Sequence, residues 1–209
     1  MCGRFSQFHS WQEVHAYLNI FGAARNLPAR YNIAPTQDAG VVRQGAEGRG
    51  LDFLRWGLVP SWAKDSSMAA RMINARAETV VQKPSFRSAF HKRRCLVPAD
   101  GFYEWQSTGK QKSPKYIYLK DNALFAFAGI WAEWKQPEEV IRSFCIITTE
   151  ANSFLKPIHH RMPVILDESA QQSWLDLANE DLDQLSSLLK PCEQGLLVAD
   201  PVSSHVNNP

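Results

Sequence analysis

Between residues 116 and 150 the chain carries three apolar runs rich in β-branched and aromatic residues, and these runs constrain the fold more than any other feature. They read YIYLK (116–120), LFAFAGIW (124–131) and FCIITTE (144–150). Such residues fit the pleated surface of a sheet, and the turn-forming pairs Asp121-Asn122 and Gln136-Pro137 separate the runs. The sequence therefore predicts three strands that pair as antiparallel hairpin neighbours.

Patterns typical of helices flank these runs. Residues 10–21 open with a predicted capping box, in which the Ser10 hydroxyl and the Glu13 carboxylate each accept from an otherwise unpaired backbone amide. Residues 168–178 and 180–189 also show apolar faces at helical spacing. The apolar positions expected in the first helix are Val14, Tyr17, Leu18 and Phe21.

The order of these patterns indicates an α+β fold rather than a β-α-β alternation. The stretches 31–37 and 56–62 read as further strand ends, broken by Pro35 and Pro60. Of the 209 residues 44% are hydrophobic, enough for a sizeable core, and no shift in composition marks a linker. We therefore expect a single domain over residues 1–209, with a mostly antiparallel, curved β core, either two packed sheets or barrel-like, flanked by helices.

The cysteines and the lengths of the apolar runs indicate a soluble, cytoplasmic protein. No apolar run approaches the roughly 20 residues of a membrane helix, and the N-terminus lacks the pattern of a secretory signal. We expect a monomer with no cofactor and no membrane partner. The cysteines are scattered without a C-x-x-C pair, which is typical of reduced chains without disulfides or zinc knuckles: Cys2, Cys95, Cys145 and Cys192.

A net charge of +2 hides a strong asymmetry along the chain. Residues 71–94 hold seven Lys or Arg and one Glu, whereas residues 167–209 hold eight acids and one Lys. Either run could be an ordinary solvated face. The basic run also carries Phe86 and Phe90, and a basic segment with aromatics fits a groove for a polyanion. Nucleic acid is therefore a candidate partner.

The chain begins MCGRF, with a cysteine directly behind the initiator methionine. If Met1 is removed, Cys2 carries a free α-amine and a thiol on adjacent carbons, a combination that no internal residue has. The alternative is an incidental thiol, because small residues are ordinary at position 2.

Five short islands combine polar functional groups with strand-like or turn-like surroundings. They are MCGR (1–4), WGLVPSWAK (56–64), INARAET (73–79), CLVPADGFYEW (95–105) and IHHRMPVIL (158–166). In this order they resemble the SOS-response-associated peptidase family, whose members are abasic-site-processing proteins that crosslink to DNA during repair. The resemblance continues to the tail ADPVSSHVNN (199–208) and so covers essentially the whole chain.

The resemblance implies that Met1 is cleaved and that Cys2 reacts with the ring-opened aldehyde of an abasic site in single-stranded DNA. The implied product is a thiazolidine that joins the Cys2 nitrogen and sulfur to the sugar C1′. The chemistry is sound, because an α-amine has a pKa of about 7.7–8.0, against about 10.4 for lysine, and can form an imine near neutral pH. The thiol of the same residue then closes the ring. Lyase activity through the imine and removal of its own Met1 are further activities that the resemblance raises.

The resemblance also assigns catalytic roles beside Cys2. Asn74 would hydrogen-bond the reacting sugar or the Cys2 nitrogen, although most asparagines in such a place are turn or capping residues. Glu104 would donate a proton, provided that burial raises its pKa. Strand alternation places it on one face with Phe102. His159 would open the sugar hemiacetal and pass protons, whereas the role of the neighbouring His160 stays open.

Several arginines are candidate DNA ligands. The resemblance gives Arg4 and Arg76 to backbone phosphates, which suit a guanidinium fork, and Arg71 belongs to the same basic run. Arg161 pairs either with a nearby acid or with phosphate. We expect Glu78 to be structural and to neutralise a neighbouring arginine.

Trp62 and Trp105 are candidates for stacking on bases beside the lesion, and core packing is the alternative for each. The family sometimes has a second aromatic residue after the position of Trp62, whereas this chain has Ala63. This departure leaves the extent of the stacking platform open.

Two other functions fit some of these features. An N-terminal-nucleophile hydrolase would use the Cys2 thiolate against an amide, with Asn74 and His159 in support. A non-catalytic single-strand binding module would need the basic run and the tryptophans but not Cys2. A metal site at Cys2, His159 and His160 is a more distant alternative, because no ligand spacing supports it.

Overall fold

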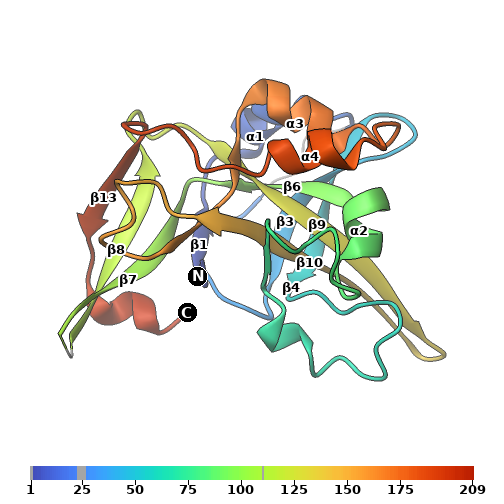
Figure 1. The fold of residues 1–209 in the computed structure, drawn as a ribbon, viewed down its shortest axis with the longest axis horizontal. Coiled ribbons are helices and arrows are strands. Elements are labelled where there is room, and N and C mark those ends of the chain that lie inside the picture. The colour runs from blue at the N-terminus through green and yellow to red at the C-terminus, as the bar shows by residue number, and fades with distance from the viewer. Residues whose placement is uncertain (1, 23–26, 110) are drawn as a thin grey trace.

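The computed structural model describes residues 2–22, 27–109 and 111–209. Met1 and Lys110 lie outside these ranges, so the expected cleavage of Met1 is not visible there. The described strands form two sheets (Figure 1). The first has the order β13 (Leu197–Pro201), β8 (Gln111–Leu119), β7 (Gly101–Thr108), β1 (Phe5–Gln7) and β2 (Arg30–Ile33). The second has the order β11 (Arg161–Pro163), β10 (Glu139–Glu150), β4 (Arg49–Trp56), β3 (Asp38–Gln44), β6 (Arg94–Ala99), β9 (Phe125–Gln136) and β12 (Ile165–Leu166), with β5 (Asn74–Arg76) beside β10.

The second sheet closes on itself. β10 pairs antiparallel with β9 and parallel with β4, so that β10, β4, β3, β6 and β9 form a barrel-like ring. β5 continues the parallel pairing beyond β4 on the same strand. The other pairings are antiparallel, except for an isolated bridge from Ile20 to Arg49. The expected α+β fold with a mostly antiparallel, barrel-like core is thereby confirmed.

Strand β9 of the barrel is apolar on both faces. In β9, Phe125 and Phe127 pack into the core shared with the first sheet, whereas Ala126 and Ala128 face a second core. The helices α1 (Trp11–Leu18), α3 (Glu168–Leu175) and α4 (Leu182–Ser187) lie together along one side of the barrel, and α2 (Arg87–Lys92) lies at its end (Figure 1). A strand buried on both faces has no polar side, which accounts for the unbroken run LFAFAGIW.

One strand pairing was predicted wrongly. The runs 124–131 and 144–150 lie in β9 and β10, which are antiparallel neighbours as expected. The run 116–120 lies instead in and just beyond β8, which belongs to the first sheet and pairs with β7 and β13. Residue propensity identifies a strand but not its partner, because the pairing depends on which apolar faces meet in the folded chain.

The helices are present but shorter than predicted. The capping box at Ser10 and Glu13 forms, and α1 ends where Asn19 adopts a left-handed conformation with a φ of 48°. Phe21, predicted on the apolar face, lies beyond this end and is 63% exposed. The predicted helices 168–178 and 180–189 correspond to α3 and α4, each of which stops sooner than the apolar pattern suggests.

The basic run 71–94 does not form one continuous groove. Phe86 and Phe90 are buried in the core, so the prediction that they line a polyanion surface is wrong. Arg94 is also buried, and its guanidinium donates to the backbone carbonyls of Trp174 (2.6 Å) and Phe90 (3.1 Å), among others. These three side chains stabilise the packing of helices on the barrel.

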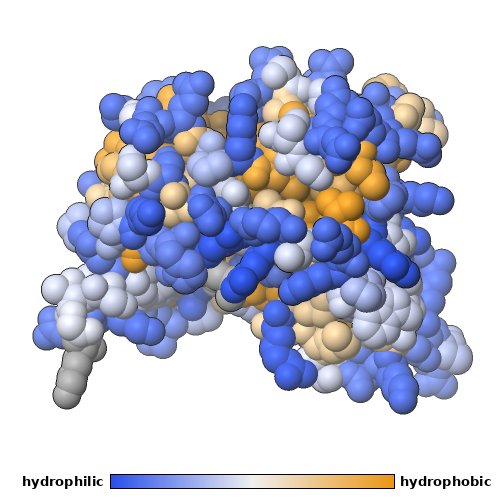
Figure 2. Space-filling view, viewed as in Figure 1, coloured by the Kyte–Doolittle hydropathy of each residue, from blue (hydrophilic) through white to orange (hydrophobic). Residues whose placement is uncertain are grey.

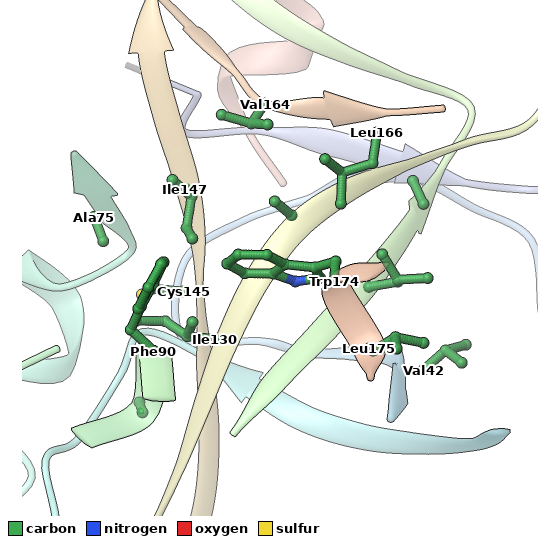
Figure 3. Close-up of a cluster of buried hydrophobic side chains, with 14 of the residues drawn as sticks. Val42, Ala75, Phe90, Ile130, Cys145, Ile147, Val164, Leu166, Trp174 and Leu175 are labelled. Carbon is green, nitrogen blue, oxygen red and sulfur yellow. The ribbon is translucent and has the colours of Figure 1, made fainter. Parts of the chain in front are cut away.

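Trp174 anchors α3 to the barrel. Its indole lies among Phe90, Ile130 and Ile147 in the buried cluster (Figure 3). Its Nε1 donates to the carbonyl oxygens of Cys95 (3.0 Å) and Gly129 (3.3 Å), which belong to neighbouring strands of the ring. This single side chain therefore combines apolar burial with two hydrogen bonds to the barrel.

Replacing Trp174 should separate these two contributions. We expect Trp174→Ala to lower the free energy of unfolding by about 3–5 kcal/mol, because it leaves a large cavity. Trp174→Phe keeps most of the apolar contact and should cost about 1–2 kcal/mol through the lost hydrogen bonds. Urea denaturation followed by circular dichroism measures the free energy of unfolding of both variants. Equal losses in the two variants would contradict the division of the Trp174 contribution into apolar contact and hydrogen bonds.

Candidate functional site

The four residues predicted to be catalytic meet at the seam between the two sheets. Pairing of β1 with β7 brings the N-terminal segment beside Glu104, while β5 and the turn before β11 bring Asn74 and His159 from the barrel side. Asn74 Nδ2 donates to the Cys2 carbonyl oxygen (2.8 Å), and His159 Nδ1 lies 4.0 Å from Glu104 Oε1. In the space-filling view the surface is hollowed between the two sheets (Figure 2), close to the start of β1 and to the C-terminus (Figure 1).

Cys2 is completely buried. Its Sγ lies 3.9 Å from the carbonyl oxygen of Arg4. Burial, and next the negative charge of Glu104, raise the pKa of the Cys2 thiol well above its usual range. In the state described the sulfur is therefore a neutral thiol rather than a thiolate.

Glu104 is a buried carboxyl group at the floor of the site, with 4% of its surface exposed. Along β7, Phe102 and Glu104 are buried whereas Tyr103 and Trp105 are only partly so, which agrees with the predicted alternation. Burial raises the pKa of Glu104, as the sequence argument required. Such a carboxyl group keeps its proton to a higher pH than an exposed one and can act as a proton donor.

His159 is held by its own chain and lies next to Glu104. The backbone amide of Arg161 donates to His159 Nδ1 (2.9 Å), and the Arg161 carbonyl oxygen lies 3.1 Å from the same nitrogen. Burial lowers the pKa of His159, which favours the neutral imidazole at pH 7. The exposed ring of His160 stacks on it at a centroid distance of 4.4 Å.

Arg161 forms a pair with an acid. Its Nη1 and Nη2 donate to the two carboxylate oxygens of Glu78 (2.6 and 3.0 Å), and Nη2 also donates to the Thr148 carbonyl oxygen (2.6 Å). Arg161 is buried, and Glu78 neutralises it, as predicted for the acid. The pair connects the turn after β5 to β11 and so braces the segments that carry Asn74 and His159.

The remaining candidate DNA ligands differ in exposure. Trp62 lies in a turn after β4 and is 59% exposed, whereas Ala63 beside it is buried. Arg71 and Arg76 are also exposed, and Arg76 lies two residues after Asn74 in β5. Trp62 and these two arginines are thus free to meet a ligand.

Arg4 and Trp105 are both held by polar contacts that the sequence argument missed. Arg4 Nη1 donates to Asn32 Oδ1 (2.8 Å), and Trp105 Nε1 donates to Asn207 Oδ1 (2.9 Å). Asn32 lies in a short edge strand, and Asn207 lies in the C-terminal turn η2 (Ser204–Asn207). The one available signal was the resemblance of the tail 199–208 to the family, which gives no contacts.

Among the residues that the structure describes, no group of three or more His, Cys, Asp or Glu side chains could hold a metal ion. All four cysteines are free thiols. No helix in the described ranges is both long enough and apolar enough to cross a membrane.

The ion pair of Glu78 gives a pH-dependent prediction. Hydrogen bonding to Arg161 lowers the pKa of Glu78 in the folded protein. The ion pair therefore contributes its full stabilisation above the pKa that Glu78 has in the unfolded chain, and this stabilisation is lost as the pH falls through the lower pKa of the folded state. Because Glu78 is about half-exposed, we expect Glu78→Gln to cost about 1 kcal/mol at pH 7. Urea unfolding between pH 7 and 3.5 should show this difference shrinking toward acid, and a constant difference would contradict the assignment.

Comparison with other proteins places these features in a family. A family model described as SOS response associated peptidase (SRAP) matches residues 1–209. A crystal structure of a protein from Bacteroides thetaiotaomicron, 30% identical, superposes with a TM-score of 0.88 and covers 100% of this chain and 97% of that one.

Two named relatives agree with this match. Abasic site processing protein YoqW of Bacillus subtilis (strain 168) is 44% identical over 214 residues, which cover 100% of this chain and 95% of that protein. Abasic site processing protein HMCES of Gallus gallus is 37% identical over 194 residues, which cover 80% of this chain and 57% of that protein. With its full length matched and its predicted site residues gathered at one seam, the chain belongs to the SOS response associated peptidase (SRAP) family.

Proposed function

We propose that this protein binds single-stranded DNA and crosslinks itself to abasic sites through Cys2, after removal of Met1. The observation that carries the proposal is the meeting of Cys2, Asn74, Glu104 and His159 at one seam, although they lie on four separate segments of the chain. The names of the relatives YoqW and HMCES, both abasic site processing proteins, support the choice of lesion.

The reaction joins one residue to one aldehyde and releases one water. The α-amine of Cys2 adds to C1′ of the ring-opened sugar and gives a carbinolamine. Loss of its hydroxyl as water forms an imine, and the Cys2 sulfur then adds to the imine carbon while its proton passes to the nitrogen. The product is a five-membered thiazolidine, whose closure is favoured because both nucleophiles belong to the same residue.

The neighbouring side chains supply the proton transfers. Glu104, whose pKa is raised by burial, donates a proton to the departing hydroxyl group of the carbinolamine. His159, whose pKa is lowered by burial, accepts a proton as the sugar hemiacetal opens. Asn74 holds the Cys2 carbonyl group and thereby fixes the N-terminal residue in the site.

Exposed groups on the segment 62–76, which ends in β5, are suited to hold the DNA strand. Arg71 and Arg76 can meet backbone phosphates, and the exposed indole of Trp62 can stack on a base beside the lesion. Arg161 has no such role in this proposal, because Glu78 and Thr148 occupy its guanidinium. It is a positioning residue for the loop of His159.

The environment of the thiol favours this function over an N-terminal-nucleophile hydrolase. A hydrolase of that type needs a thiolate, whereas burial and Glu104 raise the pKa of the Cys2 thiol. In the crosslinking reaction the amine attacks first and the thiol is required only for ring closure. A simple single-strand binding module would have no use for the buried cluster of Cys2, Glu104 and His159.

The role of Cys2 is tested with an abasic oligonucleotide and its intact counterpart. We expect a heat-resistant adduct with the abasic strand alone, whose mass equals protein without Met1 plus DNA minus one water. Cys2→Ala should lose this adduct but still give an imine that borohydride traps, because its α-amine remains. The imine is also the species from which a lyase side reaction would cleave the strand.

A heat-resistant adduct that persists in Cys2→Ala would overturn the proposal, as would an acyl-enzyme formed with amide substrates in place of the DNA adduct. Binding of intact and abasic strands with equal affinity and no adduct would favour the binding module.

Glu104→Gln tests the proton donor. We expect the rate of adduct formation to fall by about 10²–10⁴-fold, because general acid catalysis is lost, while the affinity for intact single-stranded DNA changes little. The same variant should raise the thermal midpoint at pH 8, where the wild type carries a costly buried charge. This gain should fade as the pH falls and the wild-type carboxyl group becomes protonated. Equal losses of affinity and rate would identify Glu104 as structural instead.

A further inference from the structure

The C-terminal turn, residues 203–208, is fixed against the first sheet. β13 pairs with β8 just before it, and the backbone amide of Val202 donates to the Pro114 carbonyl oxygen (3.1 Å). Asn32 Nδ2 donates to the carbonyl oxygens of Val206 (3.1 Å) and Asn208 (3.2 Å). The turn is therefore held from two sides, by the strand that leads into it and by the edge strand β2.

This turn occupies one side of the Arg4 guanidinium. Arg4 Nη1 donates both to Asn32 Oδ1 (2.8 Å) and to the Val206 carbonyl oxygen. Arg4 Nε is buried and has no hydrogen-bond partner in the described part of the chain. Nη2 makes no hydrogen bond in the described ranges and is not among their buried unpaired atoms, so it is the donor that a phosphate can reach. The contacts with the turn thus use Nη1 and leave Nη2 for a ligand.

The same turn holds Trp105. Its Nε1 donates to Asn207 Oδ1 (2.9 Å), and the Arg4 guanidinium carbon lies 5.8 Å from the Trp105 ring centroid. Arg4 directly precedes β1 and lies beside β7, which carries Trp105, because Tyr103 on β7 donates its backbone amide to the Arg4 carbonyl oxygen (2.9 Å). The guanidinium and the indole therefore form one unit, whose outer polar contacts are made by the C-terminal turn.

We propose that the C-terminal turn is a positioning clamp, in which Val206 and Asn32 aim Nη2 of Arg4 at a backbone phosphate and Asn207 fixes the Trp105 ring beside it. The inference rests on the proposed function, since it takes single-stranded DNA as the ligand. Preorganisation of this kind lowers the entropic cost of ordering long side chains when the strand binds. Asn207 and Asn32 are thus positioning residues, and they act before the covalent step.

Asn207→Ala tests the clamp on intact single-stranded DNA, which carries no aldehyde. We expect the Kd to rise by about 3–10-fold, the range that follows from loss of one hydrogen bond. At saturating abasic DNA the rate of adduct formation should stay within about twofold, since the catalytic groups are untouched. Asn208→Ala is the matched control, because the Asn208 side chain makes no hydrogen bond in the described structure, and it should bind like the wild type.

A double-mutant cycle with Trp105→Phe separates positioning from a general structural effect. If Asn207 acts through the indole N–H, Asn207→Ala should cause no further loss of affinity in the Trp105→Phe background. Asn32→Ala provides a second variant, and it should lower the salt dependence of log Kd by about 0.7, the value for one phosphate contact on a single strand.

Three results would overturn the clamp. The first is an Asn207→Ala protein that binds DNA like Asn208→Ala, and the second is one that binds DNA more tightly than the wild type. The third is an Asn207→Ala substitution that lowers DNA affinity in the Trp105→Phe protein as much as it does in the wild type. Weaker binding by Asn207→Ala together with absence of any Cys2-dependent adduct would retain the clamp and overturn the proposed crosslinking function instead.

Discussion

The backbone hydrogen bonds of β10 hold together both the barrel and the candidate site, because this strand is paired along both of its edges. One edge pairs with β9 and then with β11, and the other pairs with β4 and then with β5. The first half of the strand thereby closes the barrel. The second half places β5, which carries Asn74, opposite β11, which follows His159. A change in the register of β10 would therefore disturb the barrel and the site together.

The site also depends on two glutamates in opposite environments. Glu78 is about half-exposed and faces the buried guanidinium of Arg161, so hydrogen bonding lowers its pKa. Glu104 is buried, so its pKa is raised. The first carboxylate is fixed as a charged brace between β5 and β11, and the second is suited to carry a proton. Chemically identical side chains thus differ in pKa because their surroundings differ, which suits the first to bracing and the second to the proposed proton transfer.

Of the barrel strands, the sequence predicted β9 and β10, because a strand buried on both faces leaves a continuous apolar run such as 124–131. It did not predict β3, β6 or most of β4. It predicted helix starts better than helix ends. The start of α1 is set locally by Ser10 and Glu13, whereas its end at Asn19 depends on how the following segment joins the barrel. It assigned the run 116–120 to the wrong neighbour, since strand pairing is a long-range choice.

The candidate site likewise combines features that local sequence predicts with contacts that only long-range packing sets. Cys2, Asn74, Glu104 and His159 became candidates through the resemblance of their surrounding motifs, and simple strand alternation correctly placed Glu104 on the buried face of β7. The contacts of Arg4 and Trp105 with Asn32 and the C-terminal turn had no local signal. These polar residues lie far apart in the sequence, and a single asparagine can serve as well in a cap or a loop.

By itself the sequence determined the fold class, the apolar strand through residues 124–131 and the position of a cysteine directly after Met1. These properties follow from residue type and short-range spacing, which act within a few residues. Only the tertiary structure decided which arginines are exposed, as Arg76 is, and which are buried like Arg94 and Arg161. It also decided the raised pKa of Glu104 and the contacts around Arg4. Burial and electrostatic environment are properties of the packed molecule, because they depend on side chains that only folding brings together.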